Sequence, residues 1–199
     1  MGAQMTNTKK INRREFVKAL LARFPDALVV TGLGSPSYDV FAAGDRPGNF
    51  YLWGAMGGST SVALGLALAQ PERQVIAITG DGEQLMGIGS LATAAAQQPA
   101  NLTLVALDNG HFGETGMQPS HTSLGTSLAG VAKASGIANT IELRHVEQLD
   151  QLVELIGNGN GTTFAQVFID AEEHQRALPP RDGVYVKNRF RAHLGFAPM

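Results

Sequence analysis

Short apolar runs alternate along the chain with stretches whose apolar residues recur at helical spacing. The runs have the length and composition of strands buried in a parallel sheet. They span residues 27–31, 75–78, 102–107, 137–143 and 164–169. The stretches with helical spacing span residues 12–23, 57–70, 89–98, 129–136 and 146–156. The alternation predicts an α/β fold, a three-layer α/β/α arrangement around a doubly wound, mainly parallel sheet.

The length of 199 residues fits one domain with a core large enough to be stable alone. The pattern divides the chain into an N-terminal tail at 1–11, an α/β domain at 12–170 and a C-terminal extension at 171–199. The extension contains Tyr185, Phe190 and Phe196. Three interpretations of it are open: packing across a partner subunit, covering a site, or a plain surface extension.

Composition argues against nucleic-acid-binding, membrane-spanning and iron–sulfur proteins. A net charge of −2 without a basic stripe argues against a nucleic-acid partner. The longest apolar run, at about 62–69, is too short to span a bilayer, and residues 1–10 lack the apolar segment of a signal peptide. A cytoplasmic setting is therefore expected. Because the chain has no cysteine, it offers no thiolate ligands for an iron–sulfur cluster.

Two loops that follow neighbouring predicted strands carry metal-ligand chemistry. Gly80-Asp81-Gly82 follows the run at 75–78, and Asp108-Asn109-Gly110 follows the run at 102–107. A right-handed crossover through the helix at 89–98 brings both loops to the same edge of the sheet, where open α/β folds bind ligands. Carboxylate, amide and carbonyl oxygens suit Mg²⁺, which usually completes its shell with phosphate oxygens and water. Helix amides after Gly82 would face such a phosphate.

The Gly80-Asp81-Gly82 turn, followed by Asn109 after a second strand, resembles the fingerprint of thiamine diphosphate-binding domains. The resemblance implies a thiamine diphosphate-binding fold that holds the cofactor through Mg²⁺. It assigns the metal to Asp81, Asn109 and the main-chain oxygen of His111. Further cofactor contacts implied by the match are Gly80, Gly82, Glu83, Phe112 and Gly113.

Two segments upstream extend the resemblance. Residues 52–58 resemble the family segment in which a glycine carbonyl accepts the aminopyrimidine amino group and a large apolar residue holds the cofactor bent. That match assigns the carbonyl to Gly54 and the wedge to Met56, both of which act in activating the cofactor. Residues 31–37 resemble the first diphosphate-contacting loop, with Gly34 and Ser37 as the best matches.

In this family the cofactor lies between two domains, and a glutamate of the second domain activates the pyrimidine ring. A chain of this length has no room for that domain. The resemblance therefore implies a second subunit that carries the pyrimidine-binding domain and the activating glutamate. Paired heterodimers, hence a heterotetramer or larger assembly, are expected.

Residues 108–120 resemble the β subunits of sulfopyruvate decarboxylase and the related phosphonopyruvate decarboxylases. The implied activity is that of a lyase, a 2-oxo acid decarboxylase with a small 2-oxo acid as substrate, in which His111 and Glu114 are candidate proton donors. Tyr38-Asp39 stands where relatives carry Arg-Glu, and Glu114 replaces a small residue. On this charge count the substrate is expected to be a less charged 2-oxo acid.

Other functions share parts of these patterns. The β subunit of a thiamine-dependent 2-oxoacid oxidoreductase ordinarily brings cluster cysteines, which are lacking here. A carboligase would use the same residues with a different final step, and a non-catalytic scaffold subunit would not need Asp81, Asn109, Gly54 and Met56. A nicotinamide or flavin domain would want Gly-x-Gly-x-x-Gly at its first helix.

Overall fold

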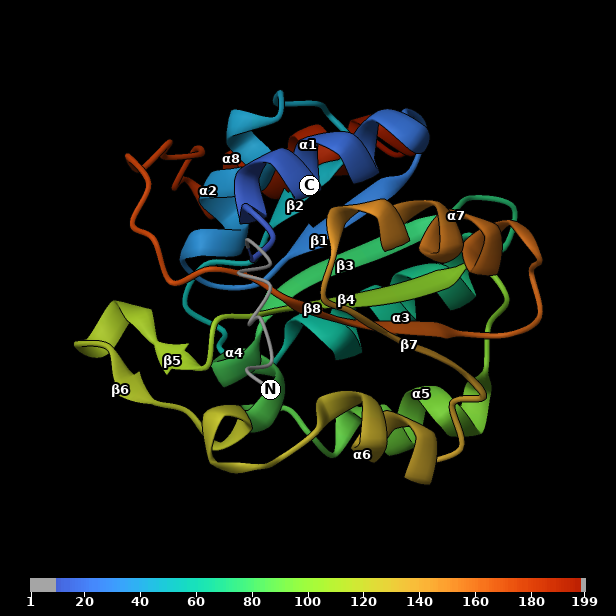
Figure 1. Cartoon of the computed structure of the whole chain (residues 1–199). Coiled ribbons are helices and arrows are strands. Elements are labelled where there is room, and N and C mark those ends of the chain that lie inside the picture. The colour runs from blue at the N-terminus through green and yellow to red at the C-terminus, as the bar shows by residue number, and fades with distance from the viewer. Residues whose placement is uncertain (1–9, 198–199) are drawn as a thin grey trace, which may run out of the picture.

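The computed structural model describes residues 10–197, which form a parallel six-stranded sheet between helical layers (Figure 1). The strand order is β2-β1-β3-β4-β8-β7. The strands are β1 (Leu28–Thr31), β2 (Asn49–Tyr51), β3 (Val75–Gly80), β4 (Leu102–Asp108), β7 (Asn139–Leu143) and β8 (Thr163–Phe168). The expected three-layer, mainly parallel fold is confirmed.

Alternate residues of each strand enter two separate apolar cores, as the two-residue period of a strand requires. Val29, Ile76 and Val105 face one core, whereas Val30, Ala77 and Leu104 face the other. The first core is covered by α1 (Arg13–Arg23), α2 (Ser35–Ala42) and α7 (Leu149–Gly157). The second is covered by α3 (Ser59–Ala69), α5 (Ser90–Gln97) and α6 (Leu128–Ala134).

The expected helices form with small shifts of their ends. Asn12 caps α1, because its Oδ1 accepts hydrogen bonds from the main-chain N–H groups of Arg14 and Glu15. The predicted helix at 146–156 begins instead with a 3-10 turn at Val146–Gln148 before α7. The sequence pattern missed β2 and α2. β2 has three residues, too few for a period to show, and the start of α2 falls within residues 31–37, which were matched to a loop. The helix expected around Gly82 forms as the six-residue α4 (Asp81–Met86).

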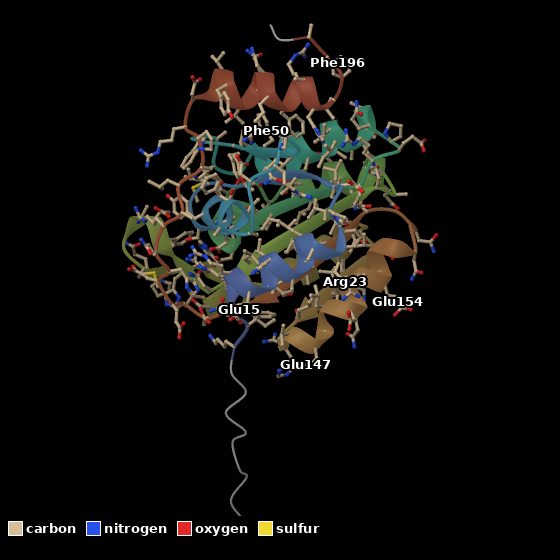
Figure 2. The ribbon with its side chains drawn as sticks, turned by 90° about the horizontal axis from the view of Figure 1, so that it is seen from above. Glu15, Arg23, Phe50, Glu147, Glu154 and Phe196 are labelled. Atoms are coloured by element: carbon tan, nitrogen blue, oxygen red, sulfur yellow. The ribbon has the colours of Figure 1, made fainter. Side chains whose placement is uncertain are left out.

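The C-terminal extension contains a helix that the sequence pattern also missed, α8 (Gly183–His193). Only Val186 and Phe190 of α8 are buried, so its sequence shows little helical periodicity. Phe190 packs edge-on against Phe50 of β2 with 5.4 Å between ring centroids. Figure 2 shows α8 along the outer edge of the molecule with Phe50 beneath it. The extension thus packs against its own domain.

The segment that leads to α8 runs past the carboxyl ends of the strands. Arg14 Nη2 donates to the Gln175 carbonyl at 2.9 Å, and Trp53 Nε1 donates to the Pro180 carbonyl at 2.9 Å. These bonds hold residues 175–180 beside the predicted site. Among the described residues, no helix is long and apolar enough to cross a membrane.

Candidate functional site

The loops after β3 and β4 meet at one edge of the sheet, as predicted. Gly80, the last residue of β3, is paired with Leu107 of β4. The next residue on each side is an aspartate: Asp81 directly after β3 and Asp108 at the end of β4. A cavity of about 190 Å³ opens there. Residues of six different segments line it: Arg13, Leu33, Ser35, Pro36, Met56, Gly80, Asp81, Gly82, Glu83, Leu107, Asn109, His111, Phe112, Gly113, Glu114, Thr115 and Ile169. Most of the predicted site residues are therefore brought together.

Asp81 and Asp108 are buried and share hydroxyl donors. Ser120 Oγ donates to Asp81 Oδ2, and Thr122 Oγ1 donates to Asp108 Oδ1 at 2.7 Å. Thr122 Oγ1 also lies 3.3 Å from Asp81 Oδ2. Gln166 Nε2 donates to Asp108 Oδ2 at 2.6 Å. Sequence reasoning missed these three donors, because a hydroxyl or an amide far along the chain has no local signature.

Asp81 lines the cavity, and Asp108 is a second buried carboxylate close to it. Burial raises the pKa of Asp81 to about 6; the Ser120 hydrogen bond lowers this pKa, and the charge of Asp108 raises it. Within residues 10–197, neither Asp81 nor Asp108 forms an ion pair with a basic side chain. A divalent cation with oxygen ligands fits this donor set, because it would supply the missing positive charge.

The loop after β4 presents further oxygen atoms. It continues into a hairpin of β5 (His111–Phe112) and β6 (Gln118–Pro119). The carbonyls of Gly110 and Phe112 accept hydrogen bonds from Ser120 and Met117 of the returning strand. Because carbonyls alternate along a strand, that of His111 points away from this partner. Pro119, which stands opposite His111, has no N–H to offer it.

The Asn109 and His111 side chains are turned toward their own loop. Asn109 Oδ1 accepts a hydrogen bond from the His111 N–H at 2.9 Å and keeps a second lone pair. The His111 ring places Nδ1 2.8 Å from the Asn109 carbonyl oxygen. This contact engages one ring nitrogen of His111, which was predicted as a candidate proton donor.

Glu83 ties the loop after β1 to α4. Its Oε2 accepts a hydrogen bond from the Leu33 N–H at 2.9 Å, and burial raises the pKa of its carboxyl group. A Cβ atom at Gly32 would stand 1.6 Å from the same Oε2, so residue 32 must be glycine for Glu83 to reach Leu33. Glu83 therefore lines the cavity with one oxygen already bonded.

Close glycine contacts also position the aromatic and apolar walls. A Cβ atom at Gly82 would lie 2.6 Å from the Phe112 ring, which therefore rests on the backbone of α4. Gly57 and Gly87 meet backbone to backbone, because a Cβ at Gly87 would be 2.2 Å from the Gly57 carbonyl oxygen. That contact fixes the turn carrying Met56, whose side chain lines the cavity and is 40% exposed.

Three predicted cofactor contacts lie outside the cavity wall. Gly54, with φ of +71°, occupies the exposed turn just before Met56. Ser37 is buried, and its Oγ donates to the Gly32 carbonyl at 2.7 Å. Gly34 packs under Glu114. The cavity is lined in this loop by Leu33, Ser35 and Pro36 instead.

The structure places two arginines near the residues from which a less charged substrate was expected. Arg176 Nη2 lies 3.5 Å from Glu114 Oε2, and its guanidinium lies 5.8 Å from the centroid of the Tyr38 ring. Buried Asp39 is held by Arg13 at 3.4 Å and Arg14 at 3.1 Å, while burial raises the pKa of its carboxyl group. Arg13 itself lines the cavity. Counting residues 38, 39 and 114 alone therefore missed two nearby cations, Arg13 and Arg176.

Comparisons with known proteins indicate the family of the chain. The family model described as thiamine pyrophosphate enzyme, C-terminal TPP binding domain, matches residues 37–167. Sulfopyruvate decarboxylase subunit beta of Methanococcus maripaludis is 39% identical over 183 residues, 91% of this chain and 96% of that protein. Phosphonopyruvate decarboxylase of Streptomyces viridochromogenes is 44% identical over 188 residues, 92% of this chain but 46% of that protein.

Solved structures share the fold at lower identity. The thiamine diphosphate-dependent 4-hydroxybenzoylformate decarboxylase of Rhodococcus jostii superposes with a TM-score of 0.72 at 21% identity. Benzoylformate decarboxylase of Polynucleobacter necessarius superposes with a TM-score of 0.70 at 19% identity. This chain is covered to 87% in both cases and spans 35% and 36% of those chains, respectively.

Proposed function

The chain belongs to the thiamine pyrophosphate enzymes, as a C-terminal TPP-binding domain, and from this premise we propose that it is the cofactor-holding subunit of a 2-oxo acid decarboxylase. The substrate is proposed to be a small 2-oxo acid of the sulfopyruvate or phosphonopyruvate type, in line with the names of the two relatives described above. The observation that carries the proposal is the pair of buried carboxylates, Asp81 and Asp108, beside an outward-pointing His111 carbonyl.

The residues present fit a magnesium ion that bridges to a diphosphate. Asp81, Asn109 and the His111 carbonyl would supply three oxygen ligands, and phosphate oxygens and water would complete an octahedral shell. Ser120 and Thr122 hold the Asp81 carboxylate in place through hydrogen bonds. Hydroxyl donors that orient a ligating carboxylate strengthen metal binding.

When bound, thiamine diphosphate would supply a carbon nucleophile for the 2-oxo group and a thiazolium ring that takes up the electron pair released with carbon dioxide. This chain's own residues hold and shield the cofactor. Met56 and Phe112 give the cavity apolar surface, and Met56 is the residue proposed to hold the cofactor bent. Glu114 remains the candidate proton donor, with Arg176 as its partner.

The proposed active site is completed by a second subunit. The turn at Gly54, Ala55 and Met56 is exposed in this chain, although it carries two residues proposed to contact the cofactor. The name "subunit beta" of the archaeal relative supports a partner, as does the 46% coverage of the longer streptomycete relative. We propose that the partner brings the pyrimidine-binding domain and its glutamate.

Calorimetric titration tests the proposal. The purified chain is titrated with thiamine diphosphate with and without Mg²⁺, alone and after co-expression with the proposed partner subunit. We expect binding that requires Mg²⁺, is lost in Asp81→Ala and is retained in Asp150→Ala, which removes an exposed carboxylate on α7. Absence of binding in the complex would remove the thiamine assignment. Product analysis then separates a released aldehyde from a carboligation product.

A further inference from the structure

Arg13 is a buried cation whose hydrogen-bonding capacity is largely unused. Its side chain is 9% exposed, and its Nε lies 3.4 Å from Asp39 Oδ2. Among residues 10–197, Arg13 Nε is a buried donor without a hydrogen-bond partner, and so is the Asp39 Oδ2 acceptor that faces it. Buried arginines normally satisfy most of their five donors. The contacts of Arg13 within the described chain therefore leave donor capacity for a ligand.

The position of Arg13 directs it to the functional cavity. It is the first residue of α1, and Ile11, two residues earlier, bridges to Ile169 just beyond β8. This bridge anchors the start of α1 at the carboxyl edge of the sheet. Arg13 consequently lines the same cavity as Asp81, Asn109 and Met56. It also lines an adjoining cavity together with Glu114.

Arg13 shares its acidic ion-pair partner with a second arginine. Asp39 is the acidic partner of both Arg13 and Arg14, so two cations share one carboxylate. Arg14 is satisfied further by the Gln175 carbonyl at 2.9 Å. Arg13 has no second partner of this kind within the described chain. The Arg13 guanidinium is shielded from bulk water, shares its carboxylate with Arg14 and borders the cavity. Such a cation favours an anionic ligand.

We propose that Arg13 is the oxyanion-binding residue of this cavity. Its planar fork suits two oxygens of a tetrahedral phosphate, phosphonate or sulfonate group. Two sources carry this chemistry: the second acidic group of the substrate and the terminal phosphate of the cofactor. The inference rests on the proposed function and adds to it a residue that selects for an acidic ligand.

Three variants test the role of Arg13. Arg13→Gln removes the charge, Arg13→Lys keeps a charge without the fork, and Arg14→Gln is the matched control because it also takes one cation from Asp39. Comparing the two glutamine variants separates ligand binding from any destabilisation of buried Asp39. The probes are inorganic sulfate, measured by thermal unfolding against chloride at equal ionic strength, and Mg²⁺-thiamine diphosphate, measured by calorimetry. The third probe is the substrate: KM is measured for sulfopyruvate and for pyruvate with the two-subunit complex.

We expect Arg13→Gln to lose the stabilisation by sulfate that wild type and Arg14→Gln retain. If the cofactor phosphate is the ligand, its dissociation constant rises by about 10- to 100-fold, the range for a hydrogen bond to a charged group. If the substrate group is the ligand, KM for sulfopyruvate rises by a similar factor while KM for pyruvate is unchanged. For Arg13→Lys, each of these quantities should lie between the values for wild type and Arg13→Gln.

Equal behaviour of Arg13→Gln and Arg14→Gln with all three probes would overturn the role of Arg13. Failure of the wild-type complex to bind the cofactor would instead count against the proposed function. The sulfate measurement needs neither cofactor nor partner, so it still decides whether Arg13 binds an oxyanion.

Discussion

At the scale of single residues, the site depends on contacts that only glycine permits. Glu83 reaches the Leu33 amide across the space where a side chain at Gly32 would lie. Phe112 rests on Gly82 in the same manner. These glycines do not act through backbone freedom, because neither has a positive φ. They act by leaving room for a neighbouring side chain.

Replacing Gly32 by alanine should therefore destabilise the chain. The new Cβ would displace the Glu83 carboxylate from the Leu33 amide and leave buried polar groups unpaired, with an expected loss of about 1–3 kcal/mol. The measurement is urea unfolding. Gly65→Ala on α3, where a Cβ meets nothing within 4 Å, is the control and should be neutral or slightly stabilising. Equal stability of the two variants would contradict the explanation.

At the scale of elements, the β5–β6 hairpin returns the chain to the residues it has just left. Ser120, which follows β6, donates to Asp81 at the start of α4. Thr122 then reaches Asp108 at the end of β4. The hairpin thus supplies polar support for carboxylates on two adjacent strands. The hydroxyls hold Asp81 in one orientation, as a metal ligand requires.

Ser120→Ala should weaken Mg²⁺-dependent binding of thiamine diphosphate by about 10-fold or more, since loss of a residue that orients a metal ligand has effects of that size. Calorimetry at several Mg²⁺ concentrations measures the change. Thr93→Ala removes an exposed hydroxyl on α5 and serves as the control. A Ser120→Ala variant with wild-type Mg²⁺ dependence would show that the hairpin does not support the metal site.

At the scale of the whole molecule, this chain contains one half of the proposed active site. It provides the edge with Asp81, Asn109 and Met56, while the turn around Gly54 stays exposed. The C-terminal extension does not replace a second domain, because its helix packs along β2.

The isolated chain should therefore bind Mg²⁺-thiamine diphosphate without decarboxylating 2-oxo acids. Adding the partner subunit should restore turnover, because the proposed partner would supply the glutamate that activates the pyrimidine ring. Release of carbon dioxide from sulfopyruvate, phosphonopyruvate and pyruvate is the assay. Turnover by the isolated chain at the rate of the complex would show that a second subunit is not required.

The sequence by itself determined the layered parallel sheet and the meeting of Asp81 with Asn109. Buried strands show as continuous apolar runs, and right-handed crossovers leave little choice of edge for the residues that follow them. Only the tertiary structure decided the roles of Ser120, Thr122 and Gln166. It also decided that Ser37 turns inward and that Arg13 enters the cavity. These side chains lie far along the chain from their partners, and hydrogen bonds and charge balance between distant segments leave no periodic signal in the sequence.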